Sequence, residues 1–284
     1  MFSSQRLGIS LAFSLAVAAS AARAADLPHS PLLEPNAKVI SVLEGPETAV
    51  KAESATRQVL DLSQLKWTVA GFLPHLWELS WRNEGVWKMH EADVPPVPMQ
   101  VPGSVQAALL AAGVISDWNQ PFESRKSEWV ENRHWICHAA IPDGWLKPGA
   151  EMRLECLGLD WAGWVMINSK EVGRFRGTHT PYGFDVTKVL KPKGNVIDII
   201  FDLPPRWLGQ FGQTSKMTEW KARYNYTWDW VPRIVQAGIW DDIRLVATTG
   251  PHIADFQCAA DADVKSGKGW LEMAADIAGK PNGT

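Results

Sequence analysis

Short apolar runs alternate with turn residues along most of the chain. Apolar runs cover residues 67–72, 134–141, 152–157, 163–167, 196–201 and 239–247. Turn residues such as Pro142-Asp143-Gly144 and Lys193-Gly194-Asn195 stand between them. Many short apolar runs separated by turn residues are typical of β-sandwiches and barrels. The pattern therefore predicts an all-β domain over residues 58–249.

One segment follows a helical pattern instead. Ser104 is a favourable N-cap, residues 105–112 are mostly alanine and leucine, and Gly113 is a typical helix end. We expect one short helix here, covering an end of the sandwich.

The two ends of the chain differ from the middle. Residues 1–24 have a basic start, an apolar centre and an Ala22-Arg23-Ala24 cleavage pattern, which predicts a signal peptide and export to the periplasm or the cell exterior. The apolar centre is shorter than the roughly 20 residues that span a bilayer, so no membrane span is expected after cleavage. Four prolines interrupt residues 25–57, a predicted tether.

A second region begins after the sandwich. Two strand-like runs, 252–256 and 269–273, follow Thr249-Gly250-Pro251. Two or three strands cannot close a sandwich. Residues 250–284 are therefore predicted to be the incomplete start of another β-domain.

Charge and cysteine content narrow the possible partners. The net charge is -3 without a Lys/Arg cluster, so nucleic acid and anionic lipid are not expected. Cys137, Cys156 and Cys258 have no metal-binding spacing. Small buried thiols are the favoured interpretation of Cys137 and Cys156, and a disulfide between them is left open. No histidine-carboxylate cluster suggests zinc, and no cofactor is expected.

Tryptophan is the most distinctive feature of the composition. The chain holds 16 tryptophans, most of which must pack in the interior. Those in strand-like runs, which we expect to be structural, are Trp67, Trp135, Trp161, Trp164 and Trp240.

The segment YNYTWDWVPR, residues 224–233, suggests chemistry instead of packing. Trp228 and Trp230 flank Asp229. An indole face can cover the apolar face of a sugar ring, and a carboxylate accepts hydrogen bonds from hydroxyls. If the segment is extended, residues i and i+2 face one side and residue i+1 the other. We therefore favour Asp229 as the first sugar contact and one of the two indoles as the second.

Four stretches together resemble a known family: residues 101–119, 128–142, 154–201 and 224–245. In order and spacing they are similar to the N-terminal sugar-binding domain of glycoside hydrolase family 2, most closely its β-mannosidase branch. The resemblance implies a jelly-roll, galactose-binding-like β-sandwich. In complete members an immunoglobulin-like domain and a (β/α)8 barrel with two catalytic glutamates follow. This chain stops at Thr284, inside the second domain, so we expect it to lack that barrel and to be inactive alone.

The resemblance also carries over to individual residues. It implies that Trp228, Asp229 and Trp230 help to line the first sugar subsite. Val231 stands where a glycine is common, and Asp241-Asp242 where arginine-proline is common. We expect Arg233 to pair with Asp241 or Asp242, because guanidinium matches carboxylate geometry; reaching the sugar site is the alternative.

Two functions are favoured over a third, in which the sandwich is purely an interaction or docking domain. The first is a part of a secreted, retaining exo-β-glycosidase that adds sugar-binding residues to a separate catalytic domain. Its partners would be a β-linked oligosaccharide or glycoside and the remaining domains. The alternative is a self-standing, non-catalytic carbohydrate-binding module.

Overall fold

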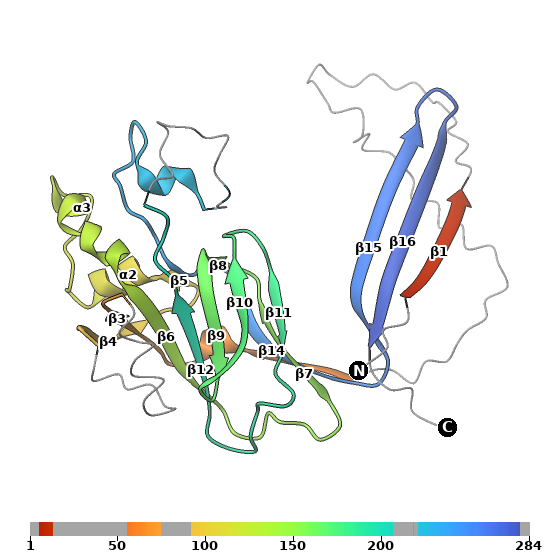
Figure 1. Ribbon diagram of the computed structural model, residues 1–284, viewed down its shortest axis with the longest axis horizontal. Helices are drawn as coiled ribbons and strands as arrows, with labels where there is room; N and C mark the ends of the chain where they lie inside the picture. The colour runs from red at the N-terminus through yellow and green to blue at the C-terminus, as the bar shows by residue number, and fades with distance from the viewer. Residues whose placement is uncertain (1–5, 14–55, 75–91, 207–217, 219–220, 279–284) are drawn as a thin grey trace. The chain divides into compact units, whose positions relative to one another are not determined.

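The computed structural model describes residues 6–13, 56–74, 92–206, 218 and 221–278. The chain divides into two compact units (Figure 1). One is the segment Thr56–Thr249, and the other combines Met1–Ala55 with Gly250–Thr284.

The first unit is built around a six-stranded antiparallel sheet with the order β10-β9-β12-β6-β3-β4. Its strands are β3 (Trp67–Phe72), β4 (Val94–Met99), β6 (His134–Ile141), β9 (Ala162–Ile167), β10 (Lys170–Arg176) and β12 (Asn195–Phe201).

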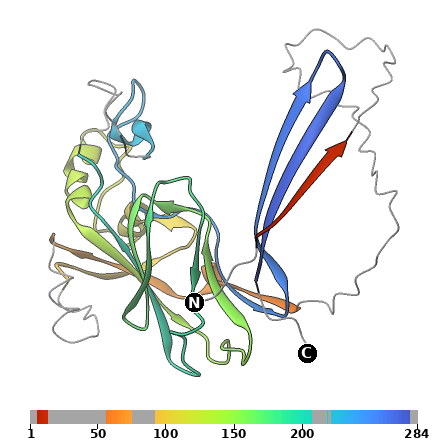
Figure 2. The same cartoon turned by 45° about the vertical axis from the view of Figure 1, so that its right-hand side comes forward.

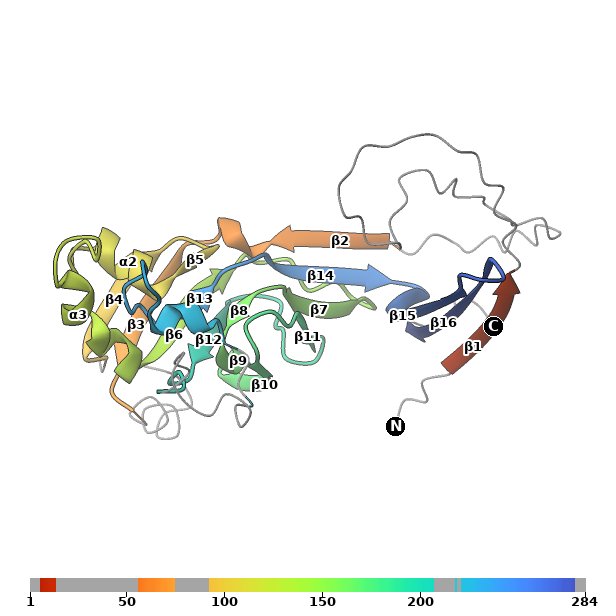
Figure 3. The same ribbon diagram turned by 90° about the horizontal axis from the view of Figure 1, so that it is seen from above.

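A four-stranded antiparallel sheet forms the second layer, with the order β11-β7-β14-β2 (Figure 3). Its strands are β2 (Thr56–Asp61), β7 (Glu151–Cys156), β11 (Tyr182–Asp185) and β14 (Ile243–Thr249). A small sheet joins β5 (Gly103–Ser104), β13 (Gly238–Ile239) and β8 (Leu159–Asp160). The predicted all-β sandwich is confirmed.

The core lies between the two sheets and follows the alternation of each strand. In β7, for example, Met152, Leu154 and Cys156 are buried, while the intervening residues are charged. Trp67 and Trp135 fill the same core, and each indole N–H donates to a backbone carbonyl, of Leu62 and Val130 respectively. Buried indoles usually need such a partner.

The tryptophan predictions held with one clear exception. Trp161 is also buried and Trp164 is half-buried, whereas Trp240 is 42% exposed. Trp240 follows the two-residue strand β13, where the chain has left the sheet. Its indole N–H donates to the Thr178 carbonyl at 2.9 Å, so the ring is fixed although it is exposed.

The predicted helix is α2 (Val105–Ala111), and the Ser104 hydroxyl caps it by accepting from the Ala107 amide. The prediction of a single helix was incomplete. The structure adds a short helix, α3 (Glu123–Lys126), and the 3-10 turns η1 (Leu62–Gln64), η3 (Glu128–Asn132) and η5 (Arg223–Tyr226).

Several short or outer strands lie outside the predicted apolar runs, and two of them, β4 and β10, are the edge strands of the six-stranded sheet. β4 contains three prolines, Pro95, Pro96 and Pro98. Proline lacks the amide needed inside a sheet and is confined to edges and strand starts. β10 is rich in charged residues, which are also typical of edges.

Cys137 and Cys156 lie on β6 and β7, in opposite layers, and both are buried with free thiols. The Cys137 sulfur is 3.3 Å from the Met99 sulfur. The disulfide left open by the sequence is therefore wrong, and the buried-thiol interpretation is confirmed. Cys258 is free and exposed. Burial raises the pKa of the Cys137 and Cys156 thiols well above the ordinary range.

Thiol titration tests this arrangement. We expect the native chain to release one equivalent of thionitrobenzoate with Ellman's reagent, from Cys258, because Cys137 and Cys156 are buried and protonated. In denaturant all three should react. Replacing Cys258 with serine is the control and should abolish the fast reaction. A second fast equivalent from the folded chain would contradict the assigned burial.

The second unit contains a three-stranded sheet with the order β1-β16-β15 (Figure 2). Its strands are β1 (Arg6–Phe13), β15 (His252–Asp263) and β16 (Lys268–Ala278). The strands predicted at 252–256 and 269–273 are confirmed and are longer than expected. β1 falls within the predicted signal peptide, whose cleavage stays a prediction. Most of the predicted tether lies outside the described residues, and its last two residues begin β2.

Candidate functional site

Residues 228–231 form a tight turn. The Trp228 amide donates to the Val231 carbonyl at 3.1 Å, and the Val231 amide donates to the Trp228 carbonyl at 3.3 Å. Asp229 and Trp230 therefore occupy the tip. The segment is not extended, so strand alternation does not separate Asp229 from the two indoles.

The side chains at this turn are exposed. Trp228 is 44% exposed and Trp230 is 79% exposed, with ring centroids 6.4 Å apart and planes at 80°. The Asp229 carboxylate is exposed and has no hydrogen-bond or ion-pair partner among the residues that the structure describes. The structure thus brings the three predicted residues together on one turn, with aromatic surface and a carboxylate accessible to a ligand.

The backbone before the turn adopts an uncommon conformation. Thr227 has a φ of 99°, which is rare for a β-branched residue, and its hydroxyl donates to the Val231 carbonyl at 3.0 Å. Such conformations cost of order 1 to 3 kcal/mol and persist only where surrounding contacts enforce them. The contacts described next hold the backbone around Thr227 in this conformation.

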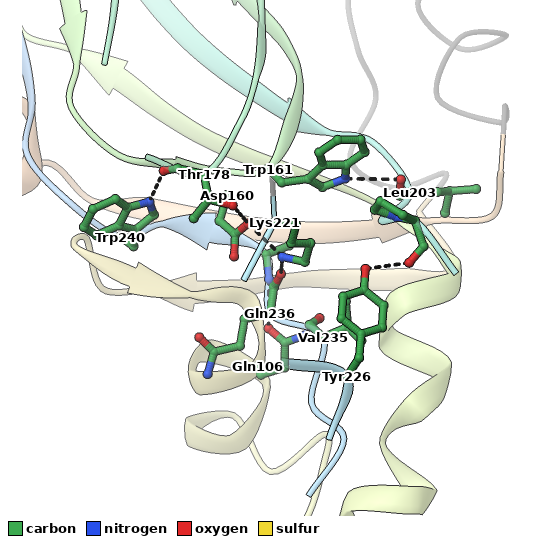
Figure 4. Close-up of polar contacts among 12 residues, drawn as sticks. Gln106, Asp160, Trp161, Thr178, Leu203, Lys221, Tyr226, Val235, Gln236 and Trp240 are labelled. Carbon is green, nitrogen blue, oxygen red and sulfur yellow. Dashed lines mark hydrogen bonds and ion pairs between the residues drawn. The ribbon is translucent and has the colours of Figure 1, made fainter. Parts of the chain in front are cut away.

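The turn belongs to a longer segment, residues 221–236, and helix α2 holds its C-terminal end. The Gln106 side-chain amide donates to the Val235 carbonyl at 2.7 Å, and its oxygen accepts from the Ala237 amide at 3.3 Å (Figure 4). Gln106 is buried, so these two bonds are protected from water. The sequence offered one signal for this contact, which is a polar residue within an otherwise apolar helix start.

Arg233 makes a different ion pair from the one predicted. Its guanidinium donates to Glu131 at 2.6 Å and lies 5.0 Å from the centre of the Tyr226 ring. The expected pairing with Asp241 or Asp242 is wrong, because those residues follow β13 and lie beside Gly158 and Leu157 instead. Arg233 thus fastens the segment to η3.

A buried ion pair fastens the start of the segment. The Lys221 ammonium donates to Asp160 at 2.7 Å and to the Gln236 carbonyl at 2.5 Å, and its side chain is 0% exposed (Figure 4). Asp160, in β8, also accepts from the Thr178 hydroxyl at 2.7 Å. Desolvation lowers the pKa of Lys221, and the Asp160 carboxylate acts in the opposite direction. The sequence contains no signal for this pair, because its members are 61 residues apart.

A small cavity lies beside the segment that carries the turn. It is lined in part by Gln106, Glu131 and Arg233 and encloses about 10 Å³, which is room for about one water molecule. Among the described residues no group of three His, Cys, Asp or Glu side chains could hold a metal ion. No helix in the same ranges has the length and apolar character to span a membrane.

Curated relatives of this chain are β-mannosidases. A β-mannosidase B of Aspergillus terreus is 27% identical over 194 residues, covering 63% of this chain and 23% of that protein. A β-mannosidase of Capra hircus is 26% identical over 215 residues, covering 66% and 23%. The chain therefore spans about a quarter of the length of these relatives.

Two solved structures share the fold. A β-D-mannosidase from Dictyoglomus thermophilum superposes with a TM-score of 0.55 at 20% identity, over 78% of this chain and 26% of that chain. A β-glucuronidase from an uncultured Clostridium species gives 0.51 at 17% identity, over 80% and 35%. The sequence model described as "Glycosyl hydrolase 2 galactose-binding domain-like" matches residues 87–241, more than half of the chain. The chain therefore belongs to the glycosyl hydrolase 2 galactose-binding domain-like family.

Proposed function

We propose that this chain is the N-terminal part of a secreted glycoside hydrolase family 2 enzyme that acts on β-mannosides. In this proposal the turn with Trp228, Asp229 and Trp230 lines a sugar subsite, and a catalytic domain outside this chain completes the site. Hydrolysis by the whole enzyme belongs to the proposal, because the chain spans about a quarter of its curated relatives. Export directed by residues 1–24 belongs to it as well.

The observation that carries the proposal is the exposed tip. Two large indoles are costly to leave in water, and nothing among the described residues engages the Asp229 carboxylate. A pyranose presents apolar C–H faces to aromatic rings and hydroxyl donors to a carboxylate. The relatives named above are β-mannosidases, which supports a mannoside as the sugar.

The second candidate function is a non-catalytic carbohydrate-binding module. The same exposed tip supports it, because sugar-binding modules also use surface aromatics. The two functions differ in affinity for the isolated chain. A subsite that shares its walls with another domain buries little of the ligand and binds weakly, whereas a complete site binds more tightly.

Titration with a β-mannoside tests the proposal at the level of single residues. In the ¹⁵N-labelled chain, the indole N–H signals of Trp228 and Trp230 should shift with methyl β-D-mannoside, with a Kd no tighter than about 1 mM. The signal of Trp270, which is exposed in β16, should not move and is the internal control. Asp229→Asn should weaken the response at both indoles.

Three results decide between the alternatives. Absence of shifts at Trp228 and Trp230, or equal shifts at Trp270, would contradict sugar binding at the turn. Micromolar affinity would support the self-standing module over the shared subsite.

A further inference from the structure

Lys221 lies in an environment that is unusual for a lysine. Its side chain is completely buried, and burying an ammonium requires that its lost hydration be replaced. Two acceptors do this, the Asp160 carboxylate and the Gln236 carbonyl. Asp160 is itself buried and is fixed by the Thr178 hydroxyl.

The position of Lys221 along the chain matters as much as its burial. Lys221 and Gln236 are the two ends of a segment that has Asp229 at its middle. One ammonium therefore joins both ends of the segment and ties them to β8. The carboxylate that it contacts also connects, through Thr178, to the fixed ring of Trp240.

Stability alone is a poor reason for such a pair. Replacing a buried ion pair with uncharged groups of similar volume is often neutral or stabilising, since desolvation offsets the attraction between the charges. What an ion pair adds is a specific geometry. Thr227, within the segment, has an uncommon backbone conformation. Such a conformation persists only where surrounding contacts enforce it.

We propose that Lys221 is a positioning residue, whose ammonium closes the segment 221–236 against Asp160 and so fixes the place of Asp229 and Trp230. The consequence for sugar binding rests on the proposed function, whereas the positioning itself does not. The Lys221 side chain is 0% exposed and that of Asp160 10%, so neither is assigned a contact with sugar.

A spin label at the turn measures the positioning without any ligand. The label is placed on Trp230→Cys in a Cys258→Ser background, where the remaining Cys137 and Cys156 are buried. The test variant is Lys221→Met with Asp160→Asn, which removes both charges at similar volume. We expect the rotational correlation time of the label to fall by at least about twofold, because the segment gains local motion. The melting temperature should change little, since no buried charge is left unpaired.

Two controls separate local positioning from a general loss of order. A label on Lys170→Cys, exposed in β10, should keep its spectrum in the same double variant. The Arg244–Glu155 ion pair in the four-stranded sheet has a similar distance, 2.6 Å, and its removal should leave the label at position 230 unchanged. If the double variant does not fold, Lys221→Gln with Asp160→Asn, which removes both charges and keeps a neutral donor for the Gln236 carbonyl, is measured with the same labels.

An unchanged spectrum at position 230 in the folded variant would overturn the proposal. Equal mobilisation at positions 170 and 230 would also overturn it, because it would show that Lys221 stabilises the whole sandwich. Either result leaves the sugar titration, and hence the proposed function, to be judged on its own.

Discussion

Replacing Trp135 with alanine is expected to lower the free energy of unfolding by about 3 to 5 kcal/mol. Trp135 is 2% exposed, and its indole N–H donates to the Val130 carbonyl at 2.8 Å. Its ring packs so closely on β3 that a Cβ added at Gly71 would lie 2.8 Å from it. Truncation would leave a cavity and an unpaired carbonyl. Since a domain of this kind has about 5 to 15 kcal/mol of stability in total, denaturant titration should show a much lower midpoint.

Trp230→Ala is the matched control, because it deletes the same side chain at an exposed position. Trp230 is 79% exposed, so its loss should change the free energy of unfolding by no more than about 0.5 kcal/mol. Comparable losses from the two variants would show that the assignment of core and surface tryptophans is wrong.

Replacing Lys221 alone with alanine should also be costly, by about 3 to 5 kcal/mol of unfolding free energy. The substitution leaves Asp160 buried without its cation, and it leaves the Gln236 carbonyl without its donor. Lys221→Met should be costly for the same reason, and adding Asp160→Asn to it should recover most of that loss, because the remaining carboxylate is neutralised. Urea denaturation of the single and double variants measures the difference.

A small loss in Lys221→Ala would contradict this account of the ion pair. It would mean that water reaches Asp160 once the lysine is gone, so that the carboxylate is hydrated and losing its partner costs little free energy. Failure of the double variant to recover would show that hydrogen-bond geometry, and not charge, dominates at this position.

Much of the sandwich can be predicted from local pattern. The runs at 67–72 and 134–141 coincide with β3 and β6, and Ser104 caps α2 as expected. Central strands and capped helices carry their signal within a few residues, since burial of one face fixes the spacing of apolar side chains. Edge strands such as β4 lack that signal because only part of their surface is buried.

The candidate site was only partly predictable. The turn residues stand together in the sequence, so their chemistry could be proposed without coordinates. The contacts of Arg233 could not be predicted, because its partner Glu131 is 102 residues away. A choice based on sequence favours acids that stand closer to Arg233 along the chain. The exposure of Trp240 was missed for a similar reason. A two-residue strand ends before it, and no pattern of that length separates an inward from an outward ring.

The most direct test of the central claim is the kinetics of Asp229→Asn in the full-length parent enzyme. If the carboxylate accepts hydrogen bonds from the terminal sugar, its loss should cost about 1.5 to 3 kcal/mol. Because about 1.4 kcal/mol is tenfold in rate, kcat/KM for an aryl β-mannoside should fall roughly ten- to a hundredfold.

The melting temperature of that variant should be unchanged, because Asp229 is exposed and has no partner among the described residues. Asp242→Asn, at an exposed position outside the turn, is the matched control and should keep wild-type kinetics. Our account predicts a selective loss of kcat/KM in Asp229→Asn. Unchanged kinetics in Asp229→Asn, with or without a loss of stability, would contradict the claim that its carboxylate binds the sugar.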